Sequence, residues 1–183
     1  MLLIEIHFME AFEMNVWIRL SKTIDLCIRW TGLVCSYLLV PLTLLVVYEV
    51  ISRSLKHPTI WTFEMSIFFY GAHFMLVAAY GLLCKSHVSI DLVSSRFSKR
   101  TNAVLSLICY LLMYFPFIFV LTYFGVSYSV NSWSMLETSW SIWGPPLYPI
   151  KTVIPLTAIM LLLQGISEVI KNIDILVRER SAK

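Results

Sequence analysis

Cysteine and histidine are the residue types in this sequence that could carry redox or metal chemistry. The cysteines are Cys27, Cys35, Cys84 and Cys109; all fall in or at the ends of apolar runs, and none belongs to a CxxC pair. Disulfide frameworks and metal sites need cysteines at paired spacings. Isolated cysteines in apolar runs are typical of thiols that pack as small apolar side chains. We therefore expect neither a disulfide framework nor a metal centre.

Haem binding would require paired histidines deep in facing helices. His73 lies near the middle of an apolar run, whereas His7, His57 and His87 lie near the ends of such runs or outside them. Without a deep partner, His73 is better explained as a neutral imidazole that is hydrogen-bonded to a neighbouring helix. Gln164 is expected to form an interhelical hydrogen bond in the same way. The sequence predicts no haem and no other cofactor.

The sequence also lacks the motifs of other enzyme classes, with no Walker A, HExxH or GxSxG pattern. A quinone-linked thiol oxidoreductase with four spans is the alternative hypothesis. Such an enzyme needs cysteine pairs in its outer loops, and residues 53–62 and 131–149 contain no cysteine. A self-contained ion carrier would line its path with acids or histidines. We therefore expect an accessory membrane subunit and not an enzyme.

Membrane helices are the elements that must hold these residues. The chain of 183 residues is 58% hydrophobic and 14% charged, with a mean hydropathy of +0.78, whereas soluble domains are roughly 45–50% apolar and about 25% charged. The runs long enough for a spanning helix of about 20 residues are about 27–52, 63–84, 103–130 and 150–170. The sequence therefore predicts an all-α integral membrane protein with four transmembrane helices.

The distribution of cations predicts the orientation of these spans. Of the 14 lysines and arginines, 11 lie in the N-terminal flank, in residues 85–102 or in the C-terminal tail. Cytoplasmic segments carry such an excess, so both termini and residues 85–102 are expected in the cytoplasm. The predicted organisation is a polar or interfacial arm at 1–26, a four-helix membrane domain at 27–175 and a cytoplasmic tail at 176–183.

The cytoplasmic connection "KSHVSIDLVSSRFSKR" mixes apolar and charged positions. Ile90, Val93 and Phe97 recur at helical spacing and would face lipid, whereas Lys99 and Arg100 would face water. This pattern predicts a short amphipathic helix on the inner leaflet, between spans two and three.

Acidic residues stand at the outer ends of two predicted spans. Glu49 precedes Arg53 by four residues, which predicts an ion pair within one helix. Glu64 opens span two, where an acid in a first helical turn is favoured by the helix dipole. Pairing of Glu64 with another subunit is the second explanation for that acid.

The outer segment "NSWSMLETSWSIWGPPLYP" at 131–149 holds three tryptophans and no lysine or arginine. The missing cations agree with an outward location. Trp133, Leu136, Trp140 and Trp143 have the spacing of one helix face, so we expect residues 131–143 to extend span three or to form an interfacial helix. This tryptophan-rich face is expected either to anchor in the lipid interface or to contact a partner protein.

The run "RSLKHPTIWTFEMSIFFYGAHFMLVAAYGLLCKSHVSIDLVSSRFSKRT" resembles the small permease subunit of TRAP (tripartite ATP-independent periplasmic) transporters, the DctQ-type family. A tryptophan and an acid open the second span, a basic residue, a histidine and an aspartate follow it, and a basic amphipathic turn comes next. The matching positions are Trp61, Glu64, Lys85, His87 and Asp91.

The resemblance covers about residues 25–175. The chain reads Cys84-Lys85-Ser86 where the family often has glycines before the histidine. The later stretch "SWSMLETSWSIWGPPLYPIKTVIPLTAIMLLLQGISE" resembles the mannitol/chloroaromatic branch, which is associated with 2-oxo acids, lactate and similar monocarboxylates.

The resemblance implies a scaffold subunit in the bacterial inner membrane. Its partners would be a large permease subunit and a periplasmic solute-binding protein, in a sodium-driven importer of organic acids; no nucleic acid is implied. Trp61, Glu64, His87 and Asp91 would contact the large subunit or fix the ends of the second helix. Trp133, Trp140 and Trp143 are the candidates for an outer partner contact.

Overall fold

The structure, a computed structural model, describes the backbone of residues 2–84 and 98–181 and the side chains of residues 15–84 and 98–178. Most of the predicted amphipathic helix, including His87 and Asp91, therefore lies outside the described residues. Within the described part, the chain is helical except for turns, loops and an isolated β-bridge between Thr138 and Pro146.

The helices combine into stretches that can cross a membrane. In chain order they are α1 (Leu2–Ser36), α2 (Leu39–Ser54), α3 (Trp61–Leu83), α5 (Lys99–Cys109), the π-helical η1 (Tyr110–Tyr114), α6 (Phe115–Ser134), α7 (Tyr148–Lys151) and α8 (Val153–Ser181). The stretches long and apolar enough to span a bilayer are Asn15–Ser54, Trp61–Leu83, Lys99–Ser134 and Tyr148–Arg178. This confirms the prediction of an all-α protein with four transmembrane helices.

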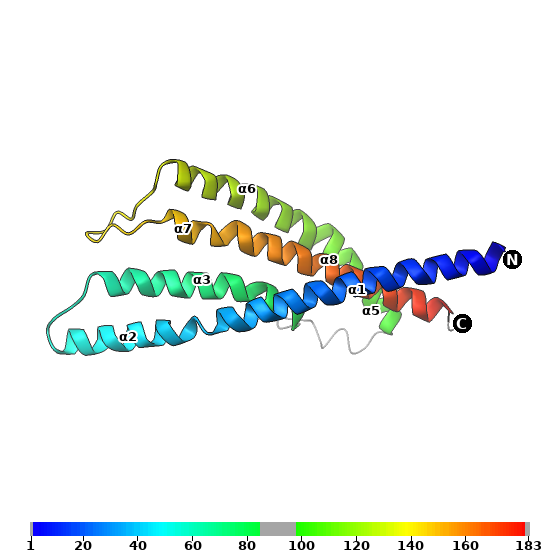
Figure 1. Ribbon diagram of the computed structural model, residues 1–183, viewed down its shortest axis with the longest axis horizontal. Helices are drawn as coiled ribbons and strands as arrows, with labels where there is room; N and C mark the ends of the chain where they lie inside the picture. The colour runs from blue at the N-terminus through cyan, green and yellow to red at the C-terminus, as the bar shows by residue number, and fades with distance from the viewer. Residues whose placement is uncertain (1, 85–97, 182–183) are drawn as a thin grey trace.

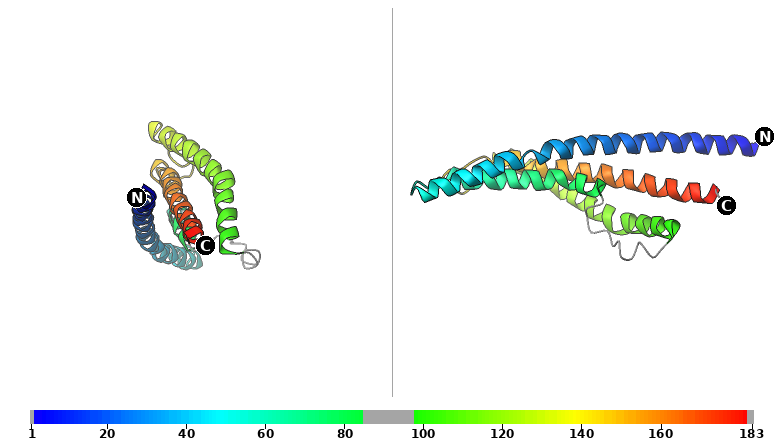
Figure 2. Two further views of the ribbon diagram at one scale, coloured as in Figure 1. Left: turned by 90° about the vertical axis from the view of Figure 1, so that its right-hand side faces the viewer. Right: turned by 90° about the horizontal axis from the view of Figure 1, so that it is seen from below.

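The helices form an elongated bundle with α8 at its centre. Both chain ends lie at one end of the bundle, whereas the α2–α3 turn and the α6–α7 loop lie at the other (Figure 1). Figure 2 shows α8 between α1 on one side and the α5–α6 helix on the other. In the fourth stretch, half (50%) of its apolar 18-residue segment is buried inside the bundle. In each of the other stretches the buried share of the corresponding segment is 6%. The other helices therefore turn most of their apolar surface toward lipid or partner proteins.

A break at residues 37–38 divides the first membrane stretch into α1 and α2. Pro41 has no N–H to donate to the carbonyl of Tyr37, and the N–H of Val40 reaches that oxygen instead at 3.0 Å. The tighter turn ends one helix and starts the next. Upstream of this break, α1 runs without interruption through residue 26, where the sequence predicts the end of the N-terminal arm.

Pro116 has a comparable effect in the third stretch. The π-helical segment η1 ends two residues before it, between α5 and α6. Because Pro116 cannot donate to the carbonyl four residues earlier, the backbone widens into a π turn there. The widened turn places Tyr114 against α8, where its hydroxyl donates to the carbonyl of Leu161 at 2.7 Å.

Gly165 makes this contact possible. A Cβ at position 165 would lie 2.4 Å from Cε1 of Tyr114, a distance that packed side chains do not reach. The tyrosine ring therefore lies directly over the α8 backbone, in the manner of small-residue contacts between membrane helices.

Gly165→Ala is expected to displace Tyr114, to break its hydrogen bond to Leu161, and to lower the free energy of unfolding in micelles by about 1–3 kcal/mol. Gly71→Ala is the matched control, because nothing lies within 4 Å of a Cβ built at Gly71. Equal stability of the two variants would show that the Tyr114 contact contributes nothing.

Candidate functional site

The outer tryptophan-rich segment is a loop and not a helix beyond Ser134. α6 ends at Ser134, and Leu136 adopts a left-handed backbone with φ 46°. The N–H of Glu137 then donates to the carbonyl of Ser132 at 3.1 Å, which closes the helix end as a left-handed residue commonly does. The prediction of a helix over 131–143 was therefore wrong past residue 134. The tryptophan spacing matched a helical period, but a leucine gives no sign that the helix stops there.

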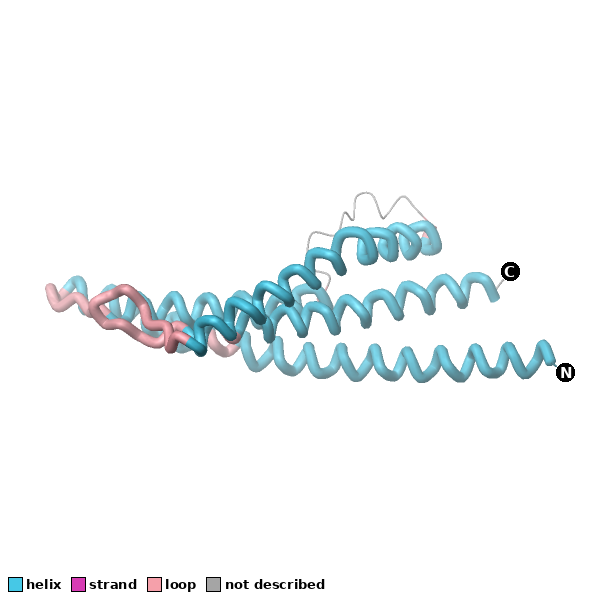
Figure 3. The backbone as a smooth tube through the Cα atoms, turned by 90° about the horizontal axis from the view of Figure 1, so that it is seen from above, coloured by secondary structure: helices cyan, strands magenta, loops and turns pink. Residues whose placement is uncertain are grey.

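Residues 135–147, which we call the outer loop, fold back on themselves (Figure 3). The N–H of Ser139 donates to the carbonyl of Pro145 at 2.9 Å, and the N–H of Leu147 donates to the carbonyl of Glu137 at 2.8 Å. These bonds lie on either side of the bridge between Thr138 and Pro146. The outer loop is consequently a closed, hydrogen-bonded structure at the end of the α6–α7 pair.

An ion pair fixes the base of the outer loop. The ammonium of Lys151 lies 2.5 Å from Oε2 of Glu137 and 4.1 Å from the centre of the Tyr128 ring. The hydrogen bond from Lys151 is the main reason that the pKa of Glu137 is lowered from its ordinary value. Glu137 therefore stays ionised at neutral pH. Its link to Lys151 is complete above the ordinary carboxyl pKa and is lost as pH falls through the lowered value.

The structure does not bring the three tryptophans to one face. Trp133 is about half exposed (48%) but is held against the α7 segment, since its indole N–H donates to Thr152 at 2.8 Å and its ring centre lies 4.5 Å from that of Tyr148. Trp143 is partly covered, whereas Trp140 is fully exposed at 101%. The exposed apolar tip of the outer loop is therefore Trp140 together with Ile142.

The turn between α2 and α3 holds Glu49 in a hydrogen-bonded group. Arg53 lies 2.5 Å from Oε1 of Glu49, which confirms the predicted ion pair within one helix. The hydroxyl of Thr59 donates to the other carboxylate oxygen, and Thr59 also contacts Thr62. These contacts join the end of α2 to the start of α3.

The signature positions Trp61 and Glu64 lie in the first turn of α3. The Trp61 ring packs against Tyr48 of α2 with ring centres 6.0 Å apart. Glu64 differs from the other acids near this end, because its Oε2 atom is buried and has no hydrogen-bond partner among the described residues. His87 and Asp91 lie outside those residues, so the structure does not place them relative to this pair.

His73 forms the interhelical hydrogen bond that the sequence predicts. Its Nδ1 lies 3.0 Å from the carbonyl oxygen of Cys35, at the end of α1. The break between α1 and α2 exposes this carbonyl to a second donor. His73 thus links α3 to the first membrane stretch.

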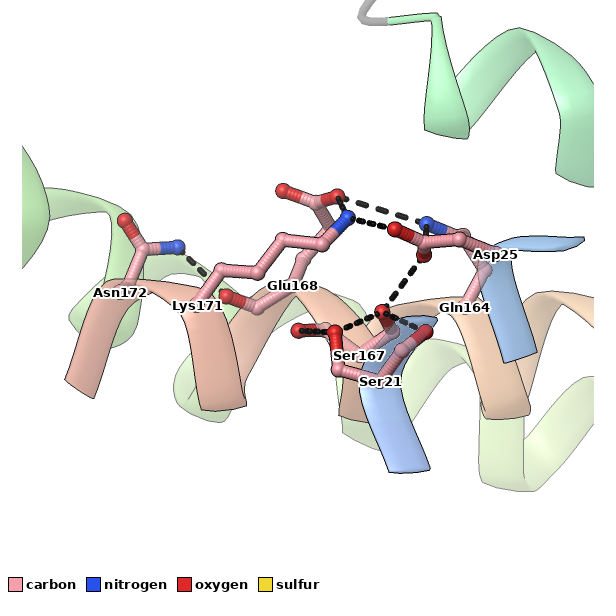
Figure 4. Close-up of polar contacts among 7 residues, drawn as sticks. All are labelled: Ser21, Asp25, Gln164, Ser167, Glu168, Lys171 and Asn172. Carbon is pink, nitrogen blue, oxygen red and sulfur yellow. Dashed lines mark hydrogen bonds and ion pairs between the residues drawn. The ribbon is translucent and has the colours of Figure 1, made fainter. Parts of the chain in front are cut away.

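A polar cluster between α1 and α8, which we call the inner polar cluster, was mostly missed by sequence reasoning (Figure 4). It consists of Ser21, Asp25, Gln164, Ser167, Glu168 and Lys171. Ser21, Gln164, Ser167 and Glu168 are buried. The sequence prediction for Gln164 as an interhelical hydrogen-bonding group is confirmed. The other members on α8 could have been found from the sequence, because Gln164, Ser167, Glu168 and Lys171 recur at helical spacing.

Asp25 is the acceptor on which the inner polar cluster converges. The hydroxyl of Ser167 donates to its Oδ1 at 2.7 Å, and the amide of Gln164 donates to the same oxygen at 3.2 Å. Lys171 lies 2.7 Å from Oδ2 of Asp25 and 2.7 Å from Oε1 of Glu168. One ammonium therefore joins an acid of α1 to an acid of α8.

This arrangement can hold helices together, and its charged groups are paired with one another. Among the described residues, no group of three metal-ligating side chains occurs, and each cysteine is a free thiol. Gln164 retains a buried Oε1 atom without a hydrogen-bond partner in the described part of the chain. The geometry favours structural coupling of α1 to α8 over catalysis.

Asp25→Ala is expected to lower the free energy of unfolding in micelles by about 1–3 kcal/mol, because it removes acceptors that Ser167, Gln164 and Lys171 use in a buried setting. Asp174→Ala serves as the control, since Asp174 pairs only with the exposed Arg178 on the same helix. Asp174→Ala should lower the free energy of unfolding by no more than about 0.5 kcal/mol. Equal losses would contradict a special role for Asp25.

Comparison with known proteins gives one informative result. No curated protein matches the chain. Residues 42–174 match the family model described as tripartite ATP-independent periplasmic transporters, DctQ component. The matched range begins in α2 and includes Trp61, Glu64, the outer loop and the α8 side of the inner polar cluster. Since it covers most of the chain, this protein belongs to the DctQ family of TRAP transporter components.

Proposed function

We propose that this chain is the small scaffold subunit of a sodium-driven, binding-protein-dependent importer of organic acids. The observation that carries the proposal is the family match over residues 42–174. In this assignment the chain enlarges the static part of the membrane complex beside a large permease subunit. A periplasmic solute-binding protein delivers the substrate.

The distribution of charges supports a scaffold role. Glu49 pairs with Arg53 at one end of the bundle, and Asp25 and Glu168 share Lys171 toward the other. A carrier that moves ions by itself requires ionisable groups along its path, whereas these charges are engaged with one another in ion pairs. The sodium and substrate sites are accordingly assigned to the large subunit.

The proposed orientation combines the fold with the cation bias. Both chain ends lie together and opposite the outer loop (Figure 1). Because cytoplasmic segments carry the excess of lysine and arginine, the terminal end is placed in the cytoplasm and the outer loop in the periplasm of a bacterial inner membrane. The arm at 1–26, the membrane domain at 27–175 and the tail at 176–183 remain the proposed organisation.

The proposed substrates are a narrower class than organic acids in general. The resemblance of residues 132–168 to the mannitol/chloroaromatic branch favours 2-oxo acids and other monocarboxylates. A scaffold subunit does not contact the substrate, so thermal-shift assays on the partner binding protein are the direct way to identify the acid.

Trp61, Glu64, His87 and Asp91 are proposed to contact the large subunit or to fix the ends of α3. Glu64 supports this best, because a buried carboxylate oxygen without a partner is costly in an apolar setting. A donor from another subunit would remove that cost.

Glu64→Gln is expected to reduce copurification of the large subunit while substrate preference stays the same, because the variant loses the negative charge but keeps the shape. Asp174→Asn is the matched control, since that acid pairs within its own helix with the exposed Arg178. Unchanged copurification together with altered substrate preference would refute the assignment.

The exposed tip of the outer loop is proposed to contact the binding protein. Its base is fixed by the Glu137–Lys151 ion pair, so the tip is presented without a large ordering cost. Tryptophan is among the residues most enriched at energetically important contacts. Trp133 and Trp143 would support this contact by holding and flanking the loop.

Trp140→Ala is expected to weaken binding of the solute-binding protein to the membrane complex by roughly 30-fold, the size of a strong interface contact, with normal copurification of the large subunit. Met135→Ala is the control, because Met135 is also an exposed apolar residue of the outer loop. Normal binding and uptake, with only a change in tryptophan fluorescence on membrane insertion, would instead identify the tip as a lipid anchor.

A further inference from the structure

One face of α1 carries cations and apolar side chains that nothing in the described chain covers. We call it the α1 stripe, and it consists of Arg19, Lys22, Leu26, Arg29, Trp30 and Leu33. Their spacing of i, i+3, i+7, i+10, i+11 and i+14 places them on one side of a helix. All are exposed. The stripe is therefore a continuous surface along α1.

The other face of α1 is occupied by the bundle. Ser21 and Ile28 are buried, and Asp25 is bonded to α8 through the inner polar cluster. The α1 stripe thus faces away from α8. It remains available to whatever surrounds the bundle at this end.

The cations of the α1 stripe have no carboxylate partner among the described residues. Asp25 and Glu168 are engaged with Lys171, and Asp174 is engaged with Arg178. Arg19, Lys22 and Arg29 form none of the ion pairs found in the described part of the chain. Within the described residues, the stripe therefore presents positive charge without a counter-ion.

The packing of α1 against α3 sets the depth of the stripe. A Cβ on Gly32 would lie 2.4 Å from the Cβ of Tyr80, so these residues are level with each other. α3 ends at Leu83, whereas α1 continues past that end (Figure 1). Arg29 therefore lies near the inner end of α3. Arg19 lies about 15 Å farther along the axis, at 1.5 Å per residue.

The α1 stripe consequently changes in character along its length. The part from Arg19 to Arg29 carries the cations. The part beyond Arg29, with Trp30 and Leu33, is apolar. This sequence of groups is complementary to a phospholipid, whose charged headgroup lies outside the acyl chains. Long basic side chains can also extend along the helix to the headgroup level.

We propose that the α1 stripe binds an anionic phospholipid of the inner leaflet. Arg19, Lys22 and Arg29 attract the negatively charged headgroup, and their long side chains can extend along the helix toward it. Trp30 and Leu33, which lie deeper than Arg29, contact the acyl chains. Charge complementarity selects this occupant, because basic surfaces on the cytoplasmic side recognise anionic headgroups.

The test uses the purified full chain in detergent with phosphatidylglycerol or phosphatidylcholine of identical acyl chains, and native mass spectrometry reports the bound lipid. The unsubstituted chain should retain phosphatidylglycerol preferentially. Each cation near a membrane surface contributes roughly five-fold in affinity, so R19Q/K22Q/R29Q should weaken binding on the order of 100-fold.

Two further variants separate charge from folding. R19K/R29K keeps every charge and should retain the lipid. R53Q/K56Q removes cations at the opposite end of the bundle and should leave retention unchanged. Circular dichroism checks that each variant is helical, so loss of lipid from a folded R19Q/K22Q/R29Q chain supports the proposal.

Other outcomes overturn the proposal. Equal retention of the two lipids would show that headgroup charge is not recognised. Displacement of lipid by millimolar glycerol phosphate would identify a phosphate site without an acyl-chain contribution. If R19Q/K22Q/R29Q keeps its lipid but loses the large subunit, the α1 stripe is a protein contact. That result would leave the proposed transport function intact, so the two proposals fail separately.

Discussion

In a bilayer, every backbone polar group must find its partner within the protein, and this requirement governs the shape of the bundle. Prolines interrupt the helical ladder at Pro41 and Pro116, and the structure uses each interruption. At the first, the tightened turn leaves the Cys35 carbonyl in reach of His73. At the second, the π turn directs Tyr114 onto the α8 backbone. The prolines therefore create side-chain contacts between helices as well as bends within them.

α8 combines most of these contacts in one element. It accepts the Tyr114 hydroxyl on one side and bonds Asp25 of α1 through Gln164, Ser167 and Lys171 on the other. The contribution of each contact is modest, but all of them locate the same helix. Because α8 takes up the polar contacts, the outer surfaces of α2, α3 and α6 remain largely apolar. Such surfaces suit lipid or another subunit of the transporter.

The sequence alone predicted the four spans, the Glu49–Arg53 pair and the roles of His73 and Gln164, because each depends on local spacing or on depth in an apolar run. It did not predict the end of α6, since a leucine rather than a glycine takes the left-handed conformation at residue 136. It also missed the convergence on Asp25, whose partners lie 139 and 142 residues away in the chain. Contacts between the first and last helices leave no local pattern in a single sequence. His87 and Asp91, which the family resemblance singled out, lie outside the described residues.

The inner polar cluster also has a consequence for the order of biosynthesis. Asp25 leaves the ribosome 146 residues before Lys171. At typical rates of translation the aspartate waits on the order of ten seconds for its counter-ion. During this interval the carboxylate must stay hydrated at the membrane surface or be held by the insertion machinery. Closure of the contact between α1 and α8 is therefore tied to synthesis of α8.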